Sequence, residues 1–522
     1  MQQVALWILC LLILGAAGCL SVGTIPQTGC YKRAGLAPKI EAVIDEFRAS
    51  VPEMMKKGKV PGCAIALVDV QGTLWTEGFG YNDRKKKIPV TPDTPFLICS
   101  MSKTFTATAV MIAVQEGLLD LDEPTTTYLP DFKVYSRYEE YPEQKITLRG
   151  LLSHTAGIPH EAAGSNMLEV TGSFEQRVRS LYGTWLKCPV GQAYSYSGAG
   201  MDLAAYVLQV VSDIPFEQYL KERIFVPLKM SNSTLDKNEI LSNPDRAIGH
   251  MIGIAKFPST HSLLGAGGVF TSAADLARFV RLHINKGTLE GKRLLDDSLI
   301  DGMLAPHALI DDSEDEDYYY GLGVIIGRSS KKEGVIVQHS GGGGGFSSFM
   351  HWYPEYGIGA LALTNKSPFP ASVELPLTLT DRLIKEKLVE KRFAAPTLEC
   401  IKCVPKWNKW AEHKPTPYKP EWRKYCGNYN PRFSGYKFKW WARLALALNL
   451  DRYTPSIKVY ESDGHLCLTE SRFFEMLEPV WTRHVRQKLQ EARPGLFFTA
   501  YGGALDFRGE IPTWRNWRLK KR

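Results

Sequence analysis

The feature that most constrains the fold is the placement of strand-like segments at both ends of a long helical region. Ala64 to Val68 and Gly72 to Gly78 have the pattern of a hairpin of strands. Further strand patterns come only after the helical and loop-rich stretch, at Tyr320 to Gly327, Val335 to Gln338 and Gly357 to Thr364. These two groups of strands enclose a mostly helical insert. We therefore expect one α+β domain whose sheet is built from distant parts of the sequence.

The composition is that of a folded, multi-domain protein. The 522 residues are enough for more than two ordinary domains with a sizeable core. Hydrophobic residues make up 44% and charged residues 23%, which are ordinary values for globular proteins. These values exclude an intrinsically disordered chain, a collagen-like repeat and a polytopic membrane protein.

The chain after residue 391 differs in composition from the chain before it. Prolines are frequent between positions 396 and 417, and eight of the 12 tryptophans lie beyond Pro396. Residues 396–522 carry 24 Lys and Arg against 12 Asp and Glu, so this part is basic and the remainder slightly acidic. We expect a main domain over residues 38–392, a linker over 393–420 and a smaller, basic, β-rich domain over 421–522.

The N-terminus has the character of an export signal. The apolar run Val4 to Ala17 is too short to span a bilayer comfortably but suits the hydrophobic region of a signal peptide. We assign residues 1–18 to this signal, which makes the protein exported, either extracellular or periplasmic. The small residues before Cys19 resemble a bacterial lipobox, which would tether the chain to the membrane. Ala16 and the lack of early Lys or Arg depart from that pattern, so plain secretion and an uncleaved anchor are alternatives.

Two side-chain clusters raise the question of a bound metal. Six carboxylates lie within residues 311–317, but the run lacks the Gly and the spaced ligands of an EF-hand, which favours a solvated acidic loop. Cys400 and Cys403 have CxxC spacing without a second CxxC or HxxxH partner, which favours a structural disulfide or two free thiols. We expect no metal site and no cofactor.

The first catalytic candidates are Ser100 and Lys103, in the sequence Ser-Met-Ser-Lys. They open a helical segment that is apolar on most sides and is therefore expected to be buried. At a helix start, residues i and i+3 share a face, so the Lys103 amine can reach the Ser100 hydroxyl. A buried lysine loses proton affinity and can act as a general base. A second S-x-x-K match begins at Ser329, but it lies in a polar loop with no helix behind it.

Two later segments supply further candidates. Tyr196 lies on a loop at the entrance of a long apolar helix, where its phenol can enter a cleft and act near a lysine cation. The alternative for Tyr196 is a packing role. His339 follows a strand and precedes a glycine run that ends at Gly345, and backbone N–H groups of glycines can approach a ligand closely, as an oxyanion hole requires. The alternative is a glycine-rich turn with an incidental histidine.

The order and spacing of these motifs resemble those of the serine β-lactamase and penicillin-binding-protein superfamily, for which S-x-x-K is a signature. The likeness is greatest to the class C β-lactamase-like serine hydrolases, a peptidase S12-like group that includes esterases and D-amino-acid peptidases. It covers roughly residues 38–390. The segments that carry it are Phe96 to Phe105, Leu118 to Asp122, Leu151 to Pro159, Gly265 to Ser272 and Asp275 to Phe279. The resemblance implies an antiparallel sheet with a helical subdomain, and an acyl-enzyme mechanism.

The resemblance also implies roles for particular residues. Ser100 would be the acylated nucleophile and Lys103 its base or proton relay. Tyr196 would match the tyrosine of the Y-x-N motif, which passes a proton to the leaving group and activates the hydrolytic water. The backbone N–H groups of Ser100 and Gly342 would form the oxyanion hole.

The substrate-binding positions implied by the resemblance are Gly198, Ser340 and Gly341, and two positions depart from the usual pattern. Gly198 stands where an Asn is usual, so an amide that helps to hold Lys103 is missing, at a cost of about 1–3 kcal/mol. His339 takes the place of the lysine in the K-T-G motif, as in its H-x-G form, and thereby removes a fixed cation. Ester or amide substrates are then better suited than substrates recognised by a carboxylate.

The tail has a likeness of its own. Segments at Tyr425 to Tyr429, Ile457 to Tyr460 and Gly495 to Ala500 resemble the small β-barrel-like domain often appended to these hydrolases. Trp440 to Leu448 combines paired tryptophans, a cation and an apolar run, as an interfacial segment would, or as a strand that is hydrophobic on both faces.

Three functions are consistent with the sequence. The first is a serine hydrolase that acts on ester or amide substrates through an acyl-enzyme. The second is a penicillin-binding protein, D-Ala carboxypeptidase or β-lactamase, and the third is a weakly active or non-enzymatic binding protein that retains the fold. We expect a small-molecule or peptide substrate and no nucleic-acid partner. The physiological substrate, the oligomeric state and the pairing of the cysteines are left open.

Overall fold

The structure is a computed structural model. It describes residues 25–161, 172–251, 254–256, 263–313, 316–329, 333–398, 403–404, 417–431, 437–438, 457–463, 465–470, 487–493, 496–498, 504–506, 513–514 and 517–521. The expected export signal over residues 1–18, Cys19 and the segment Trp440 to Leu448 lie outside the described residues. Within the described ranges, no helix combines the length and the apolar character that crossing a membrane would require.

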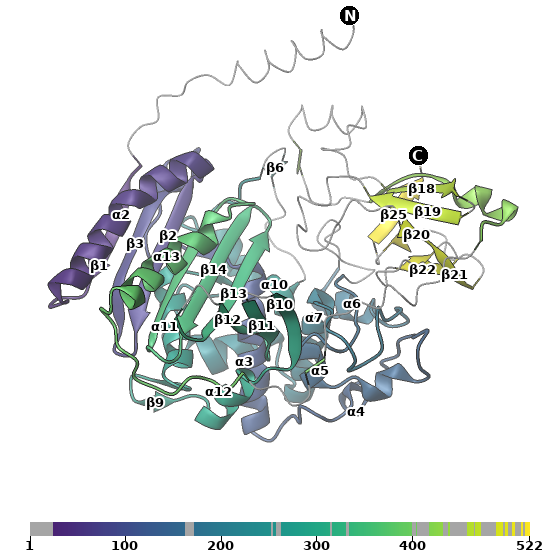
Figure 1. Ribbon diagram of the computed structural model, residues 1–522, viewed down its shortest axis with the longest axis horizontal. Coiled ribbons are helices and arrows are strands. Elements are labelled where there is room, and N and C mark those ends of the chain that lie inside the picture. The colour runs from purple at the N-terminus through teal and green to yellow at the C-terminus, as the bar shows by residue number, and fades with distance from the viewer. Residues whose placement is uncertain are drawn as a thin grey trace, which may run out of the picture.

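The main sheet has ten antiparallel strands and interleaves the two ends of the main domain (Figure 1). Its order is β1 (Gln27–Lys32), β3 (Thr73–Asp83), β2 (Gly62–Asp69), β15 (Ile358–Thr364), β14 (Phe346–Tyr353), β13 (Ile336–Gly343), β12 (Ile325–Ser329), β11 (Glu316–Tyr320) and β10 (Ala308–Ser313), with β4 (Ile88–Pro89) beside β3. The two ends meet where β2 pairs with β15, so that Cys63 lies opposite Thr364. This confirms the predicted α+β fold with a sheet assembled from distant segments.

Helices cover both faces of this sheet. Helices α2 (Pro38–Gly58) and α13 (Ala371–Lys385) lie on one face, and α11 (Ala273–Ile284) lies on the other (Figure 1). Alternate residues of β2 pack into the cores on the two faces of the sheet, because successive side chains of a strand point to opposite faces. Ile65 packs in the core under α2 and α13, whereas Ala64 and Ala66 pack in the core that contains α11. A strand that is apolar at every position is therefore buried on both sides.

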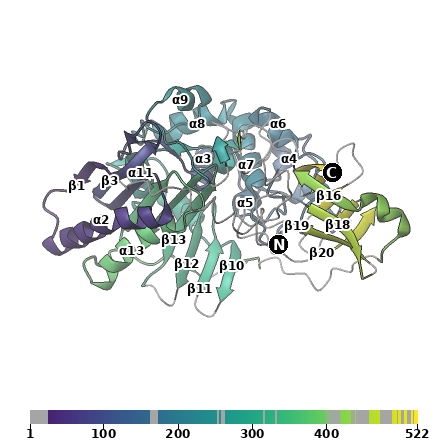
Figure 2. The same cartoon turned by 90° about the horizontal axis from the view of Figure 1, so that it is seen from above.

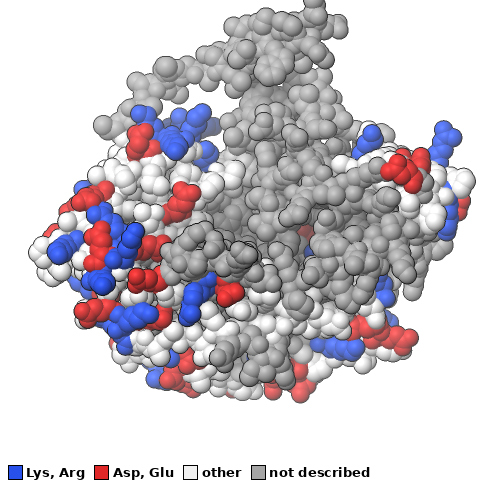
Figure 3. Space-filling model, in the orientation of Figure 1, with Lys and Arg blue, Asp and Glu red and all other residues white. Residues whose placement is uncertain are grey.

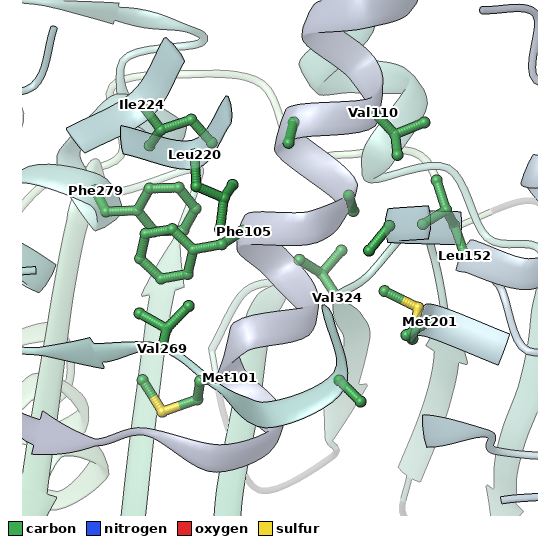
Figure 4. Close-up of a cluster of buried hydrophobic side chains, with 14 of the residues drawn as sticks. Met101, Phe105, Val110, Leu152, Met201, Leu220, Ile224, Val269, Phe279 and Val324 are labelled. Carbon is green, nitrogen blue, oxygen red and sulfur yellow. The ribbon is translucent and has the colours of Figure 1, made fainter. Parts of the chain in front are cut away.

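The helical insert forms a subdomain around α3 (Ser102–Gln115). Nearly every residue of α3 is buried, as its all-round apolar pattern predicts. The Phe105 ring stacks on that of Phe279 at a centroid distance of 3.7 Å, and Figure 4 shows Met101, Leu220 and Val324 around the same helix. The hydroxyls of the helix's buried threonines bond to backbone carbonyls, as where Thr104 donates to Gly323 at 2.8 Å. Their burial therefore leaves no polar group of these side chains unpaired.

The other elements of the main domain are short. In chain order they are β5 (Phe96–Leu97), η1 (Cys99–Met101), α4 (Thr125–Tyr128), η2 (Pro142–Lys145), α5 (Leu148–Leu152), α6 (Phe174–Arg179), α7 (Gly198–Ser212), α8 (Phe216–Leu220), η3 (Lys221–Phe225), α9 (Lys237–Ser242), β6 (Ile254–Lys256), α10 (Leu264–Gly267), β7 (Phe270–Thr271), β8 (Thr288–Leu289), β9 (Lys292–Arg293) and α12 (Asp297–Met303).

Two sequence-based expectations about the sheet were wrong. The single strand expected over Tyr320 to Gly327 is interrupted by a turn at residues 321–324, because β11 ends at Tyr320 and β12 begins only at Ile325. Gly323 in this turn has a φ of +71°, a conformation that favours glycine. The acidic run 311–317, expected as a loop, instead includes the end of β10 and the start of β11.

The C-terminal part of the chain forms a second antiparallel sheet of nine strands. Its order is β20 (Gln487–Lys488), β19 (His465–Glu470), β18 (Ile457–Ser462), β16 (Gly427–Pro431), β25 (Trp517–Lys521), β24 (Thr513–Trp514), β23 (Ala504–Asp506), β22 (Leu496–Phe498) and β21 (Gln490–Arg493). The short helix η5 (Pro420–Tyr425) precedes it and supplies Trp422 to a small core with Tyr429 and Phe497. This sheet and α2 lie at opposite ends of the molecule (Figure 2).

The segment expected as a linker touches the main domain. The N–H of Leu309 on β10 donates to the carbonyl of Val404 at 2.9 Å. Beyond the expected linker, in the part expected as the C-terminal domain, β17 (Lys437–Phe438) pairs with β6. Cys403 is disulfide-bonded, which excludes a free thiol there, whereas Cys400 lies outside the described residues.

Acidic and basic side chains are intermixed on the side of the molecule that carries α2 and α13 (Figure 3). Lys32 bonds to Glu41 and Asp45 of α2, and Arg382 of α13 pairs with Glu46 at 2.8 Å. Exposed pairs of this kind contribute little to stability.

Candidate active site

The Ser100 hydroxyl lies at the start of a buried helix, on a backbone held in an unusual conformation. The strand β5 pairs with β7 and delivers the chain to Cys99, whose φ is +50°. Such a left-handed conformation is uncommon for a residue other than glycine and is often found at functional sites. The Ser348 hydroxyl donates to the carbonyl of Ile98 at 2.8 Å and ties this turn to β14. Ser100 is only half-buried, so its hydroxyl is open to a substrate.

Lys103 follows one helical turn later and contacts Ser100. Its Nζ atom donates to Ser100 Oγ at 3.1 Å and to the carbonyl oxygen of Ala266 at 2.8 Å. The same atom lies 4.8 Å from the ring centroid of Tyr196. Lys103 is 2% exposed, so the amine works in a site from which water is largely excluded. A nucleophile and a base within hydrogen-bond reach are the elements of an activated serine.

Tyr196 lies half-buried on the loop that enters α7, where the sequence analysis placed it. This loop is tied to the segment that follows α5. The backbone N–H of Ser197 donates to His154 Nδ1 at 3.2 Å, and the Ser197 hydroxyl donates to the carbonyl of Pro159 at 2.7 Å. The Ser197 hydroxyl also accepts from Gly200 N–H and caps the helix. The structure therefore brings Ser100, Lys103 and Tyr196 to one point.

His339 lies on β13, in contact with Tyr320, and is 2% exposed. Its Nδ1 atom donates to the carbonyl of Ser340 at 2.7 Å, because a carbonyl can only accept. Its Nε2 atom is then an acceptor, and the Tyr320 hydroxyl donates to it at 2.9 Å. Burial and, to a smaller extent, the charge of Lys103 lower the pKa of His339 to about 3. His339 is thus a neutral imidazole at neutral pH rather than a substitute for a lysine cation.

The glycine run after His339 continues β13 past the end of its neighbour β12. Pairing with β12 covers only Ile336 to Gln338, so the edge of the strand from His339 to Gly343 is left uncovered by β12. A Cβ atom at Gly341 would collide with the carbonyl oxygen of Ile98, so glycine allows β13 to approach the turn before Ser100. A Cβ atom at Gly342 would meet nothing within 4 Å, and Ser340 is exposed. This edge is accessible to a ligand.

Gly198 is the first residue of α7, and its surroundings account for the absence of a side chain. A Cβ atom there would lie 3.2 Å from the carbonyl oxygen of His160, 3.8 Å from Cε1 of the His160 ring and 3.6 Å from the Cβ atom of Ala266. The ring of His160 also stacks on that of Tyr196, at a centroid distance of 5.7 Å and an interplanar angle of 24°. His160 and Ala266 therefore border the space in which a Cβ atom at position 198 would lie.

Three residues of the site were not assigned from the sequence. Tyr320 bonds to His339, the Ala266 carbonyl accepts from Lys103, and the His154 ring lies 4.4 Å from that of Tyr196. Burial holds the pKa of His154 well below its usual value. His154 and Ala266 lie in segments that carried the family resemblance, and this was the only signal for them. Nowhere in the described residues do three or more potential metal ligands gather.

Comparisons with known proteins agree with this geometry. The family model described as Beta-lactamase matches residues 47–381. The putative penicillin-binding protein PbpX of Bacillus subtilis (strain 168) is 31% identical over 237 residues, which are 44% of this chain and 52% of that protein. Protein flp of Staphylococcus aureus (strain MW2) is 28% identical over 245 residues, 44% of this chain and 47% of that protein. The chain thus matches these curated relatives over about half of their length.

A solved structure shares the fold. The octameric penicillin-binding protein homologue from Pyrococcus abyssi superposes with a TM-score of 0.57 at 21% sequence identity, over 91% of this chain and 99% of that chain. At this level of identity the likeness concerns the fold alone.

Proposed function

Because the chain belongs to the beta-lactamase family, we propose that it is a serine hydrolase that forms an acyl-enzyme on Ser100. The observation that carries the proposal is the 3.1 Å contact between Lys103 Nζ and Ser100 Oγ inside a buried site. Tyr196 beside the same amine supplies a second group for proton transfer. A binding protein that had only retained the fold would not need these three side chains together, which favours an enzyme.

In this proposal Lys103 takes the proton of Ser100 while Oγ attacks the carbonyl carbon of the substrate. The carbonyl oxygen becomes an oxyanion, which the backbone N–H groups of Ser100 and Gly342 would stabilise. Tyr196 passes a proton to the leaving alcohol or amine as its bond to the acyl carbon breaks. Water then attacks the acyl-enzyme, loses a proton to the same groups, and releases the acid and free Ser100.

The chemistry around His339 favours neutral acyl donors, namely esters and amides. A substrate carboxylate calls for a cation at the end of β13, and the buried, neutral His339 offers none because its Nε2 atom is occupied by Tyr320. Hydrogen bonding to uncharged groups along the exposed edge of β13 is better suited to this site.

A second candidate is a penicillin-binding protein or D-Ala carboxypeptidase that acts on peptides or β-lactams. Two observations favour it: the 31% identity to the putative penicillin-binding protein PbpX, and the edge of β13, which an extended peptide could join as an added strand.

One experiment separates these functions. The protein is incubated with a fluorophosphonate and, separately, with a fluorescent penicillin, and the adducts are located by intact mass and peptide mapping. We expect the phosphonate on Ser100, its loss in Ser100→Ala, and its retention in Ser102→Ala, where the Ser102 hydroxyl accepts from Val269 N–H as a structural bond. Penicillin labelling of Ser100 would favour the second candidate. No adduct with either probe, or an adduct on Ser102, would contradict both.

We also propose export, supported by the signal-like composition of residues 1–18. The mass of the mature chain tests it: cleavage after residue 18 with or without a lipid on Cys19 separates a tethered from a secreted protein. A chain that keeps residues 1–18 and stays inside the cell would contradict it.

A further inference from the structure

A buried cluster of charges lies next to the catalytic groups, in the helical subdomain. Arg177 on α6 is fully buried, Asp202 on α7 is fully buried, and Glu161 is 3% exposed. Arg177 Nε donates to Asp202 Oδ2 at 2.6 Å, and Arg177 Nη2 lies 3.7 Å from Glu161 Oε2. None of these residues carries a role in the proposed reaction.

The cluster connects to Lys103 through Ala266. Asp202 Oδ1 accepts the backbone N–H of Ala266 at 2.9 Å, and the carbonyl of the same residue accepts from Lys103 at 2.8 Å. Helix α10 is pressed against α7 here, because a Cβ atom at Gly265 would lie 2.9 Å from the carbonyl of Met201. Asp202 therefore holds the residue whose carbonyl accepts from the lysine amine.

The charges of Asp202, Arg177 and Lys103 also influence one another. Burial raises the pKa of Asp202, whereas the charge of Arg177, the Ala266 N–H and the charge of Lys103 all lower it. The lysine amine and the carboxylate thus lie within electrostatic reach of each other.

The cluster also connects to Tyr196, through His160. His160 Nδ1 lies 3.4 Å from Glu161 Oε1, and the His160 ring stacks on Tyr196. The carbonyl of His160 accepts the backbone N–H of Ala199 at 2.9 Å, which fixes the residue at the start of α7. Lys103 and Tyr196 are therefore both connected to the same group of buried charges.

Stability alone is a poor reason to keep such a cluster. Buried ion pairs contribute little net stability, and well-packed apolar replacements of both partners are often neutral or stabilising. A planar guanidinium group that bonds to a carboxylate fixes the relative position of the two side chains.

We infer that Arg177 and Asp202, backed by Glu161, are positioning residues: they aim the Ala266 carbonyl at Lys103 and hold His160 against Tyr196. The inference rests on the proposed function, since it assigns these residues to the reaction at Ser100. It also explains how the site is held without a side-chain amide at Gly198.

The test replaces both partners of the pair, in Arg177→Met/Asp202→Leu, so that neither of these two charges is left buried without the other, while Glu161 keeps its contact with His160. The measurements are the second-order rate constant for fluorophosphonate labelling of Ser100, kcat and KM for p-nitrophenyl butyrate, and the urea unfolding midpoint. The matched control is Arg48→Met/Glu77→Leu, because Arg48 Nε also contacts a fully buried carboxylate at 2.6 Å, in the core under α2. The wild-type protein is measured alongside.

We expect the Arg177/Asp202 variant to label and turn over roughly tenfold or more slowly, as a displaced catalytic group would cause, with KM within about twofold. The control should keep the wild-type rates. Wild-type rates in a folded Arg177/Asp202 variant would overturn the inference and leave the proposed function standing. A wild-type protein that does not label at all would overturn both.

Single substitutions keep the test decisive if the double variant does not fold. Arg177→Lys keeps a cation beside Asp202, whereas Arg177→Met leaves the carboxylate unpaired. We expect the lysine variant to retain at least a several-fold higher labelling rate than the methionine variant, both measured at a temperature where circular dichroism shows them folded. Equal rates would overturn the inference.

Discussion

The Tyr320 hydroxyl lies 2.9 Å from Nε2 of His339, and both side chains are buried. Tyr320 is the last residue of β11 and His339 lies on β13, so the bond reaches across the end of the intervening strand β12. It fixes one neutral form of the imidazole, in which Nδ1 carries the proton and donates to Ser340.

Tyr320→Phe should destabilise the protein. The substitution leaves Nε2 of His339 buried without a donor, which costs about 1–3 kcal/mol. Urea unfolding of wild type and variant measures the loss. Tyr128→Phe is a suitable control, because the Tyr128 hydroxyl bonds at an exposed turn and its removal should cost less. Equal stability of Tyr320→Phe and wild type would show that the bond does not matter for folding.

Tyr196→Phe should lower kcat by about 100-fold or more, since a general acid–base group typically contributes 10²–10⁴-fold. The substitution keeps the ring that packs against His154 and Lys103, so the melting temperature should stay within a few degrees of wild type. Turnover of p-nitrophenyl butyrate is the measurement. Tyr194→Phe, in the same aromatic cluster, serves as control. A loss below threefold would assign Tyr196 to packing alone.

Gly198→Asn should lower activity rather than raise it. Even the Cβ atom would lie 3.2 Å from the carbonyl oxygen of His160, which is closer than an ordinary van der Waals contact, so we expect the longer side chain to shift His160 relative to Tyr196. We expect a roughly tenfold or larger fall in the Ser100 labelling rate, as misplaced catalytic groups produce, and a smaller fall in Gly198→Ala. Faster labelling of Gly198→Asn would mean that His160 moves aside without cost and that an amide is accepted there.

The free energy of unfolding should fall as the pH falls from 7 to 5. Burial lowers the pKa of His339 to about 3 and that of His283 to about 4, whereas histidines of the unfolded chain titrate near 6.5. Between these values the unfolded state binds the extra protons, so each group removes up to about 1.4 kcal/mol per pH unit. Asp275 opposes this below about pH 6, because burial raises its pKa to about 6, and burial also raises the pKa of Asp202. Burial lowers the pKa of two further histidines, His154 and His307, so the histidines outnumber the opposing carboxyl groups.

Urea unfolding at the two pH values measures the effect. His283→Gln should reduce the pH dependence, because it removes one of the buried histidines. Equal or greater stability at pH 5 would contradict the prediction.

The parts of this protein that could be predicted from sequence are those set by local pattern. Ser100 and Lys103 are one helical turn apart, so their contact follows from helix geometry once α3 is recognised. The sheet could be predicted because β2 and β15 carry strand patterns of their own. Tyr196 was placed by its position before an apolar helix.

The contacts that were missed join segments far apart in the chain. The Lys103 amine reaches a carbonyl 163 residues later, and nothing local marks Ala266 as its partner. His339 was a catalytic candidate because it precedes a glycine run at the end of a strand, whereas its burial depends on Tyr320 and on where β12 ends. The turn between β11 and β12 was missed because tyrosines and branched residues flank its glycines closely enough to imitate one strand.

The pairing of β2 with β15 has a consequence for how the protein is made. The backbone N–H of Gly62, at the start of β2, donates to the side chain of Asn365, 303 residues later. At the usual rate of synthesis, β2 leaves the ribosome roughly 15–60 seconds before its partner. During that interval a strand that is apolar on both faces has one edge without a neighbour, and such edges pair with other chains. Folding of this protein therefore depends on the nascent chain being kept apart from others until β15 emerges.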